Sequence, residues 1–216
     1  GEPTSLVPIT AHKSITMQRI TVTGKSGHSS NPELGYSALE VMHELIGELL
    51  AYRKTLQSTH TNPLFAINTA TMNLGCIHGG DSANRICGKC SLDIDLRLLP
   101  NMSNQRVLKD IQQLMQKVQA RHDVSITIEA LFKGVDPFDQ ARDSEFVQTV
   151  EKLCGNTPDT VAFATEAPYF QQLGFDTIVI GPGSIDQAHQ PNEFLPLDSI
   201  KPTQRLVLDL IARYCY

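Results

Sequence analysis

Hydrophobic and polar residues recur with a strand-like period in four segments of the first two thirds of the chain. In one of them Leu92, Ile94 and Leu96 alternate with polar residues, which is typical of a strand buried on one face. The others are rich in Ile, Val and Thr or carry short apolar runs. The four predicted strands are residues 15–23, 65–74, 85–98 and 125–130, the last with the sequence SITIEA.

Two segments between these strands carry apolar residues at helical spacing. The first includes Leu45 and Leu49 and keeps its glutamates outside the apolar stripe. The second runs from Val107 to Val118, with Ser103 as a candidate N-cap. The order β-α-β-β-α-β predicts a split ferredoxin-like unit over residues 14–134. Both helices should cover one face of its sheet, which leaves the other face and an edge strand for a partner.

The pattern changes after residue 134 to an alternation of helices and short apolar runs, which is typical of an α/β unit. The run TIVI is apolar on both faces, as expected for a parallel strand covered by helices. Because ligands of open α/β sheets lie at the carboxyl ends of strands, the loop after TIVI is a candidate site. The predicted elements are a helix at 144–153, a strand at 160–164, TIVI at 177–180 and a helix at 202–214.

Composition narrows the class of protein. The 216 residues are 41% hydrophobic and carry a net charge of −5, which argues against a nucleic-acid or anionic-membrane partner. No apolar run approaches the roughly 18 residues that span a bilayer, and no signal-peptide pattern opens the chain. Five cysteines, an odd number, favour a reducing cytoplasm. The chain opens on Gly1 rather than Met, so we expect that an upstream part has been removed.

His189 follows a turn that carries glycine and proline. Gly181 and Gly183 allow close approach of the backbone, and Pro182 stiffens the turn. A neutral imidazole held in this way is a good zinc ligand. The alternative is a structural or surface histidine.

Three polar residues in the ferredoxin-like segment are further candidates. His28, in SGHSS, is either a polar side chain that reaches a site elsewhere or part of a turn that begins the next helix. Arg85 follows Asn84 and has the shape to bind a carboxylate at two points. An ion pair of Arg85 with Asp81 is the alternative. Glu2 and Glu166 are isolated carboxylates that indicate little by themselves.

The pair Cys87-x-x-Cys90 has the spacing of a metal or redox motif. Residues three apart in a strand point to opposite faces, and two further zinc ligands at suitable spacing are missing. We therefore interpret the pair as ordinary strand residues.

Six segments, taken together and in order, resemble motifs of the acetylornithine deacetylase family, which belongs to the M20 metallopeptidases and zinc aminoacylases. The resemblance covers essentially the whole chain. The segments are GEPTSLVPITAHK, GKSGHSSNPELG, NLGCIHGGDSANRIC, DIDLRLLPNMS, TEAPYF and GPGSIDQAHQPNEF.

The resemblance implies a domain plan. Residues 14–134 would be the ferredoxin-like lid, through which the family forms homodimers. Residues 1–13 and 135–216 would be parts of a zinc-peptidase-like α/β catalytic domain. The implied fold is therefore α/β with an α+β lid.

The resemblance also implies roles for single residues. His189 matches a ligand of one of two metals, and Glu2 matches a carboxylate ligand of the other. The metals would be zinc, with cobalt as an alternative. His28 matches a lid histidine that reaches the active site of the partner subunit and stabilises the oxyanion.

The substrate implied is an N-acetylated amino acid. Asn84 and Arg85 match lid residues that bind its carboxylate, whereas Glu166, Gly183 and Ser184 border the pocket. The implied reaction is the metal-dependent deacetylation of N2-acetyl-L-ornithine to L-ornithine and acetate, in arginine biosynthesis.

Several catalytic motifs of the family have no match in this sequence. No histidine is followed two residues later by Asp, and no two glutamates are adjacent. One recognised ligand per metal is fewer than the three or four that zinc requires. We therefore expect this chain alone to bind zinc weakly or not at all and to be inactive.

Two other functions remain open. A sibling deacylase, either succinyl-diaminopimelate desuccinylase or an aminoacylase, would share the lid and the metals but differ in the pocket. A noncatalytic dimerisation module would dimerise without any response to metal.

Overall fold

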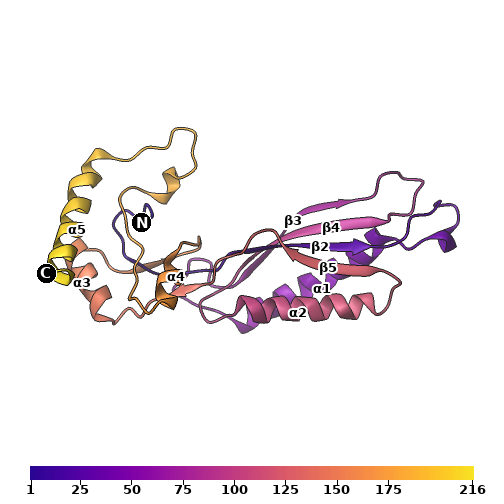
Figure 1. Cartoon of the computed structure of the whole chain (residues 1–216), viewed down its shortest axis with the longest axis horizontal. Helices are drawn as coiled ribbons and strands as arrows, with labels where there is room; N and C mark the ends of the chain where they lie inside the picture. The colour runs from indigo at the N-terminus through magenta and orange to yellow at the C-terminus, as the bar shows by residue number, and fades with distance from the viewer. The chain divides into compact units, whose positions relative to one another are not determined.

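Two units make up the computed structural model, which describes residues 1–216 (Figure 1). Unit 1 consists of Gly1–Lys13 and Pro137–Tyr216, and unit 2 is the continuous segment Ser14–Asp136. No helix in either unit has the length and apolar character needed to cross a membrane.

Unit 2 is an antiparallel four-stranded sheet with two helices. Its strand order is β3-β4-β2-β5, the ferredoxin-like arrangement that the β-α-β-β-α-β pattern predicts. The strands are β2 (Thr16–Thr23), β3 (Thr71–Gly79), β4 (Lys89–Arg97) and β5 (Ser125–Ala130), and the helices are α1 (Ala38–Thr59) and α2 (Asn104–Gln119).

Both helices of unit 2 lie on the same face of the sheet, as Figure 1 shows. The apolar side of each strand faces them, so that Ile20, Leu92 and Ile111 are almost completely buried. On the opposite face the strands present polar side chains. Arg19 forms an ion pair with Asp93 across neighbouring strands, with both nitrogen–oxygen distances at 2.7 Å.

Serine caps set the starts of the main helices. The Ser103 hydroxyl accepts a hydrogen bond from the Arg106 amide at the start of α2, which confirms the predicted N-cap. Ser37 does the same for α1 by accepting from the Glu40 amide.

Two predicted strands of unit 2 begin later than expected. Residues 65–67 form a bend, Thr69 forms only an isolated bridge with Thr61, and β3 starts only at Thr71. A local turn holds the chain just before them, because the Asn62 side chain accepts from the Leu64 amide. Residues 85–88 also lie outside β4, since the Ile86 amide donates to the carbonyl of Gly27 in a neighbouring loop.

Unit 1 contains a small three-stranded sheet in the order β6-β1-β7. Its central strand β1 is antiparallel to β6 and parallel to β7. Its core cluster is Ile9, Phe138, Ala167 and Val179. The elements are β1 (Ile9–His12), β6 (Phe138–Asp139), α3 (Glu145–Cys154), β7 (Asp159–Val161), α4 (Ala167–Gln172) and α5 (Ile200–Tyr214).

Unit 1 differs from the sequence-based prediction in two places. Residues 9–12 carry no predicted element, yet β1 is the middle strand of the sheet. The run TIVI is not a strand: it forms one antiparallel bridge, between Val179 and Ile9. The Thr177 amide donates instead to the side chain of Gln140, which ends regular pairing there.

Candidate functional site

Two loops of unit 2 bring His28, Asn84 and Arg85 together. With Ser26 and Gly27 these residues line a cavity of about 280 Å³, which we call the loop cavity. His28 and Arg85 pair as an antiparallel bridge, and the Ser29 amide donates to the Asn84 carbonyl at 3.1 Å. Residues far apart in the sequence therefore share one small polar site.

The two loops approach each other closely at Gly88. A β-carbon there would lie 2.3 Å from the hydroxyl oxygen of Ser26 and 3.3 Å from the Ser26 backbone nitrogen, so the Ser26 side chain would have to move. The Gly24 amide donates to the Gly88 carbonyl, and the Ile86 amide donates to that of Gly27. These contacts hold the two walls of the loop cavity in register.

The geometry around His28 defines the position of its ring proton. Its Nδ1 lies 3.2 Å from the Ser30 amide, which can only donate. Nδ1 must therefore accept, and in the neutral ring the proton is on Nε2. His28 is exposed, so this Nε2–H is available to donate to a ligand.

Arg85 forms an ion pair with Asp81, which is one of the two roles that the sequence allows for it. Its guanidinium contacts the Asp81 carboxylate, while 54% of the Arg85 side chain stays exposed. Ser82 donates to the amide oxygen of Asn84 at 2.6 Å, which orients that side chain. Arg85 retains further N–H donors for an anionic ligand.

A second cavity, of about 690 Å³, lies in unit 1 and is called here the chain-start cavity. Glu2 lines it together with Gly183 and Ser184. The Ser5 amide donates to the Gly183 carbonyl at 2.6 Å, which joins the start of the chain to this turn.

The two glycines of the turn have different roles. A β-carbon at Gly181 would lie 2.5 Å from the Glu2 carbonyl oxygen, so the predicted close approach of the backbone is confirmed. Gly183 has a φ of +79°, a conformation that favours glycine.

His189 is not one of the residues that line the chain-start cavity, although its neighbour in the sequence, Ala188, does line it. It is exposed, with a φ of +61°, and its backbone amide donates to a carboxylate oxygen of Glu193 at 3.1 Å. Glu193 also lines the cavity, although it is not among the site residues predicted from the sequence. The sequence feature that could have pointed to Glu193 is its position four residues after His189.

Glu166 is exposed and lies directly before α4. Its side chain makes no capping hydrogen bond to that helix, so the carboxylate is not used by the local fold. The structure does not bring it into either cavity described above.

The residues of this chain do not assemble a complete metal centre. No group of three or more His, Cys, Asp and Glu side chains is placed to hold an ion. Structural and catalytic zinc sites use at least three protein ligands. Glu2 and His189 therefore do not suffice by themselves to hold a zinc ion.

Comparison with known proteins identifies the family. The sequence profile of the peptidase dimerisation domain of the M20 type matches residues 10–123, which is more than half of the chain. Acetylornithine deacetylase of Vibrio vulnificus is 47% identical over the whole chain, and that of Edwardsiella ictaluri is 46% identical. The chain spans 57% and 56% of the lengths of these two relatives.

Solved structures show the same fold at low sequence identity. Aminopeptidase PepT from Bacillus cereus matches 98% of this chain with a TM-score of 0.76 and 18% identity, and 54% of its own length is covered. Human carnosine dipeptidase 1 matches 93% of this chain with a TM-score of 0.62 and 14% identity, and 55% of its length is covered. The profile match, the similarity over the whole of this chain and the shared fold together mean that this chain belongs to the M20 peptidase dimerisation-domain family.

Proposed function

We propose that this chain forms the lid and part of the catalytic unit of an enzyme that converts N2-acetyl-L-ornithine to L-ornithine and acetate. The observation that carries the proposal is the 47% identity with Vibrio vulnificus acetylornithine deacetylase, which extends over the whole chain. Similarity of that extent covers unit 1 and unit 2 alike. A noncatalytic dimerisation module would need only unit 2.

In this proposal His28 stabilises the oxyanion. Amide hydrolysis passes through a tetrahedral intermediate that carries negative charge on the former carbonyl oxygen. The Ser30 amide fixes the His28 tautomer so that Nε2–H is the free donor. A donor whose proton is already in position stabilises the transition state without reorganisation.

Arg85 and Asn84 bind the carboxylate of the substrate in this proposal. Arg85 would bind Asp81 and the substrate carboxylate at the same time, because a guanidinium has more N–H donors than one carboxylate can accept. The side chain of Asn84, oriented by Ser82, adds a hydrogen bond. Both side chains lie in the loop cavity with His28.

Unit 1 contributes the chain-start cavity. Ser184 and Gly183 line it beside Glu2, which supports a substrate-binding role for the turn. Glu2 and His189 would each supply one ligand to a two-zinc centre, or to cobalt in place of zinc. The metal supplies polarisation of the amide carbonyl and an activated water when bound. Because the remaining ligands are not among this chain's residues, we propose that the chain alone is inactive.

The partner proposed is a second copy of the same protein, through unit 2. The match to a dimerisation domain supports this. The cellular location proposed is the cytoplasm, because all five cysteines are free.

The test is deacetylation by this chain joined to the uncovered part of the Vibrio vulnificus relative. We expect the joined protein with added zinc to release acetate from N2-acetyl-L-ornithine and the 216-residue chain alone to release none. Higher kcat/KM for N-succinyl-diaminopimelate or for other N-acyl amino acids would favour a sibling deacylase. Appreciable turnover by the chain alone would contradict the proposal of inactivity.

Variants of the joined protein test the two lid residues. His28→Ala should lower kcat by about 100-fold or more, the usual effect of removing an oxyanion donor. Arg85→Ala should raise KM about tenfold or more, since a charged hydrogen bond is worth about 1.5–3 kcal/mol.

Matched controls lie on the same unit. His43→Ala on α1 and Arg106→Ala on α2 change exposed residues outside the loop cavity and should leave both constants unchanged. Equal losses in the variants and in their controls would contradict these roles.

A further inference from the structure

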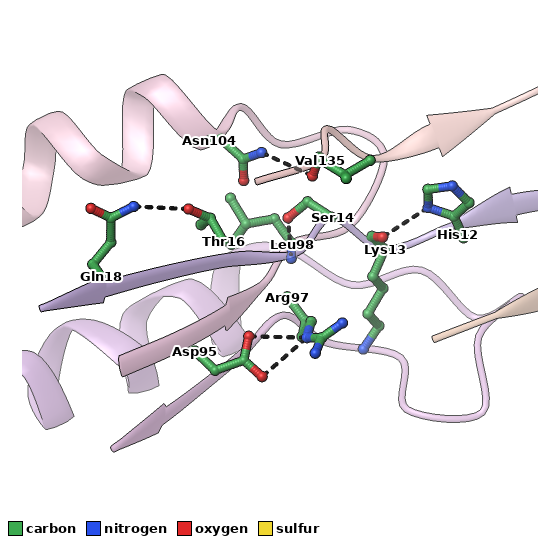
Figure 2. A network of polar contacts seen from close by, with 10 residues as sticks. All are labelled: His12, Lys13, Ser14, Thr16, Gln18, Asp95, Arg97, Leu98, Asn104 and Val135. Atoms are coloured by element: carbon green, nitrogen blue, oxygen red, sulfur yellow. Dashed lines mark hydrogen bonds and ion pairs between the residues drawn. The ribbon is translucent and has the colours of Figure 1, made fainter. Parts of the chain in front are cut away.

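His12 is a fully buried histidine at the end of β1 that the proposed chemistry does not use. It has no exposed surface, and its ring lies 5.4 Å from that of Phe138 between centroids. Both ring nitrogens have hydrogen-bond partners. Nδ1 lies 2.8 Å from the carbonyl oxygen of Lys13, and Nε2 lies 3.2 Å from the amide nitrogen of Thr165. Figure 2 shows the first of these contacts.

These two partners define one protonation state. The Thr165 amide can only donate, so Nε2 must accept and carries no proton. The Lys13 carbonyl can only accept, so Nδ1 must donate. His12 is therefore a neutral imidazole with its proton on Nδ1, the opposite tautomer to His28.

The contact with Thr165 anchors a short turn. The Thr165 amide is held by His12, and the Thr165 hydroxyl accepts a hydrogen bond from the Ala167 amide at 3.1 Å. Thr165 and Ala167 are both buried, whereas Glu166 between them is exposed. The two hydrogen bonds thus fix the backbone on both sides of a carboxylate that the local fold leaves free.

We propose that neutral His12 is a positioning residue, which holds the Thr165–Ala167 turn and so sets where Glu166 presents its carboxylate. The ligand that we propose for the Glu166 carboxylate is the free amine of N2-acetyl-L-ornithine, and only this part of the inference rests on the proposed function. The hydrogen bonds themselves do not depend on that function. His12 acts through Thr165 and makes no contact with the substrate.

Protonation of His12 would break this arrangement. A proton on Nε2 would face the N–H of Thr165, and two donors repel each other. Burial lowers the pKa of His12 below its ordinary value of 6.5, which keeps the ring neutral near pH 7. Hydrogen bonds to backbone groups act in the opposite direction and are weaker.

The neutral state of His12 does not depend on an ion pair with a charged group of the surrounding elements. The pKa of His12 is changed only by burial and by backbone hydrogen bonds. Lys13, next to His12, is itself buried, and burial lowers its pKa too. The titratable groups on the packed elements are Lys13 after β1, Asp139 on β6, Asp159 on β7, Glu166 and Tyr169 around α4, and Arg142 and Asp176 in the adjoining loops.

The direct test is nuclear magnetic resonance of the ¹⁵N-labelled 216-residue chain. At pH 7 we expect His12 to show a protonated Nδ1 and an unprotonated Nε2. On lowering the pH, the amide signals of Thr165 and Ala167 should shift with the same midpoint as the His12 ring. A proton on Nε2, or a Thr165 amide that ignores the titration of His12, would overturn the proposal.

Variants of the joined protein separate positioning from simple stability. His12→Gln supplies an oxygen acceptor where Nε2 lies and cannot titrate in this range. His12→Phe keeps a ring but removes the acceptor. We expect His12→Phe to raise KM about three- to tenfold, the effect of one lost hydrogen bond, with kcat unchanged. In the parent, KM should rise at acidic pH as His12 becomes protonated. His12→Gln should keep the KM that the parent has at pH 7 and should show no such rise.

His43→Gln, an exposed histidine in unit 2, is the control and should keep the parental pH profile. Equal KM values for His12→Phe and the parent would contradict the positioning role. If the variants fail to fold, the tautomer and the coupled titration of the parental chain still decide the outcome. A joined protein that does not act on N2-acetyl-L-ornithine would refute the proposed function, whereas the resonance test of His12 would stand.

Discussion

At the scale of single residues, Gly181 carries the closest backbone approach in the chain-start cavity. A β-carbon there would meet the Glu2 carbonyl oxygen at 2.5 Å. We predict that Gly181→Ala lowers the free energy of unfolding by about 1–3 kcal/mol, because neither backbone segment can move without loss of its hydrogen bonds. Urea denaturation followed by circular dichroism measures this.

Gly47 offers a matched control. It lies exposed inside α1, and a β-carbon added there meets nothing within 4 Å. Gly47→Ala should stabilise the chain by about 0.5–1 kcal/mol, since glycine loses more backbone entropy in a helix than alanine. Equal effects of the two substitutions on the free energy of unfolding would contradict the claim that a side chain at position 181 clashes with the Glu2 carbonyl.

The buried His12 predicts a dependence of stability on pH. Its pKa is lower in the folded chain than the ordinary 6.5, so the unfolded chain binds a proton first as the pH falls. The contribution of His12 is fully present above pH 6.5 and is lost as the pH falls through the folded pKa. The free energy of unfolding should decrease by up to about 1.4 kcal/mol per pH unit in this window.

Comparison with His12→Gln isolates this effect in urea titrations between pH 5 and pH 7. The variant should show a flatter profile. Arg19 lowers the pKa of Asp93, and His122 lowers that of Glu44. The effects of these two carboxylates on the free energy of unfolding therefore fall at more acidic pH than that of His12. Identical slopes for parent and variant above pH 5 would rule out the contribution of His12.

At the scale of elements, α2 is held to the sheet by its apolar face. Ile111 has no exposed surface and lies in the core between α2 and the strands. Ile111→Ala should cost about 2–5 kcal/mol, because it removes buried methyl groups and leaves a cavity. Ile67→Ala, at a residue that is 59% exposed, should change stability by less than about 0.5 kcal/mol. Thermal denaturation of both variants tests the difference.

At the scale of the whole molecule, unit 2 has an edge strand, β3, through which we predict pairing with a second copy of the chain. β3 pairs only with β4, and its residue Ile77 is 54% exposed. Edge strands with free backbone groups are ready to pair with another chain, and lysine discourages such pairing. We predict that the chain is a dimer and that Ile77→Lys shifts it to the monomer in analytical ultracentrifugation.

Leu64→Lys is the control for this prediction. Leu64 is 50% exposed but lies outside the strands of the sheet. This variant should sediment as the parent does. Dimers of unchanged stability in Ile77→Lys would exclude the β3 edge as the interface.

The sequence by itself determined the β-α-β-β-α-β order of unit 2. The alternation of Leu92, Ile94 and Leu96 and the stripe from Val107 to Val118 depend only on local periodicity. Both segments form the predicted type of element, although β4 begins at Lys89 rather than at residue 85. The start of β3 differs from the prediction because a local turn and bend at residues 63–67 compete with a composition that favours strands.

Only the tertiary structure decided which distant residues meet. It makes β1 a central strand by pairing it with β6 and β7, and it leaves TIVI as a single bridge. It joins His28 to Arg85 in the loop cavity and buries His12 against Thr165. Such contacts follow from sheet pairing and loop approach over long stretches of chain. No periodicity in the neighbouring residues records them, because periodicity reports only which side of an element is buried.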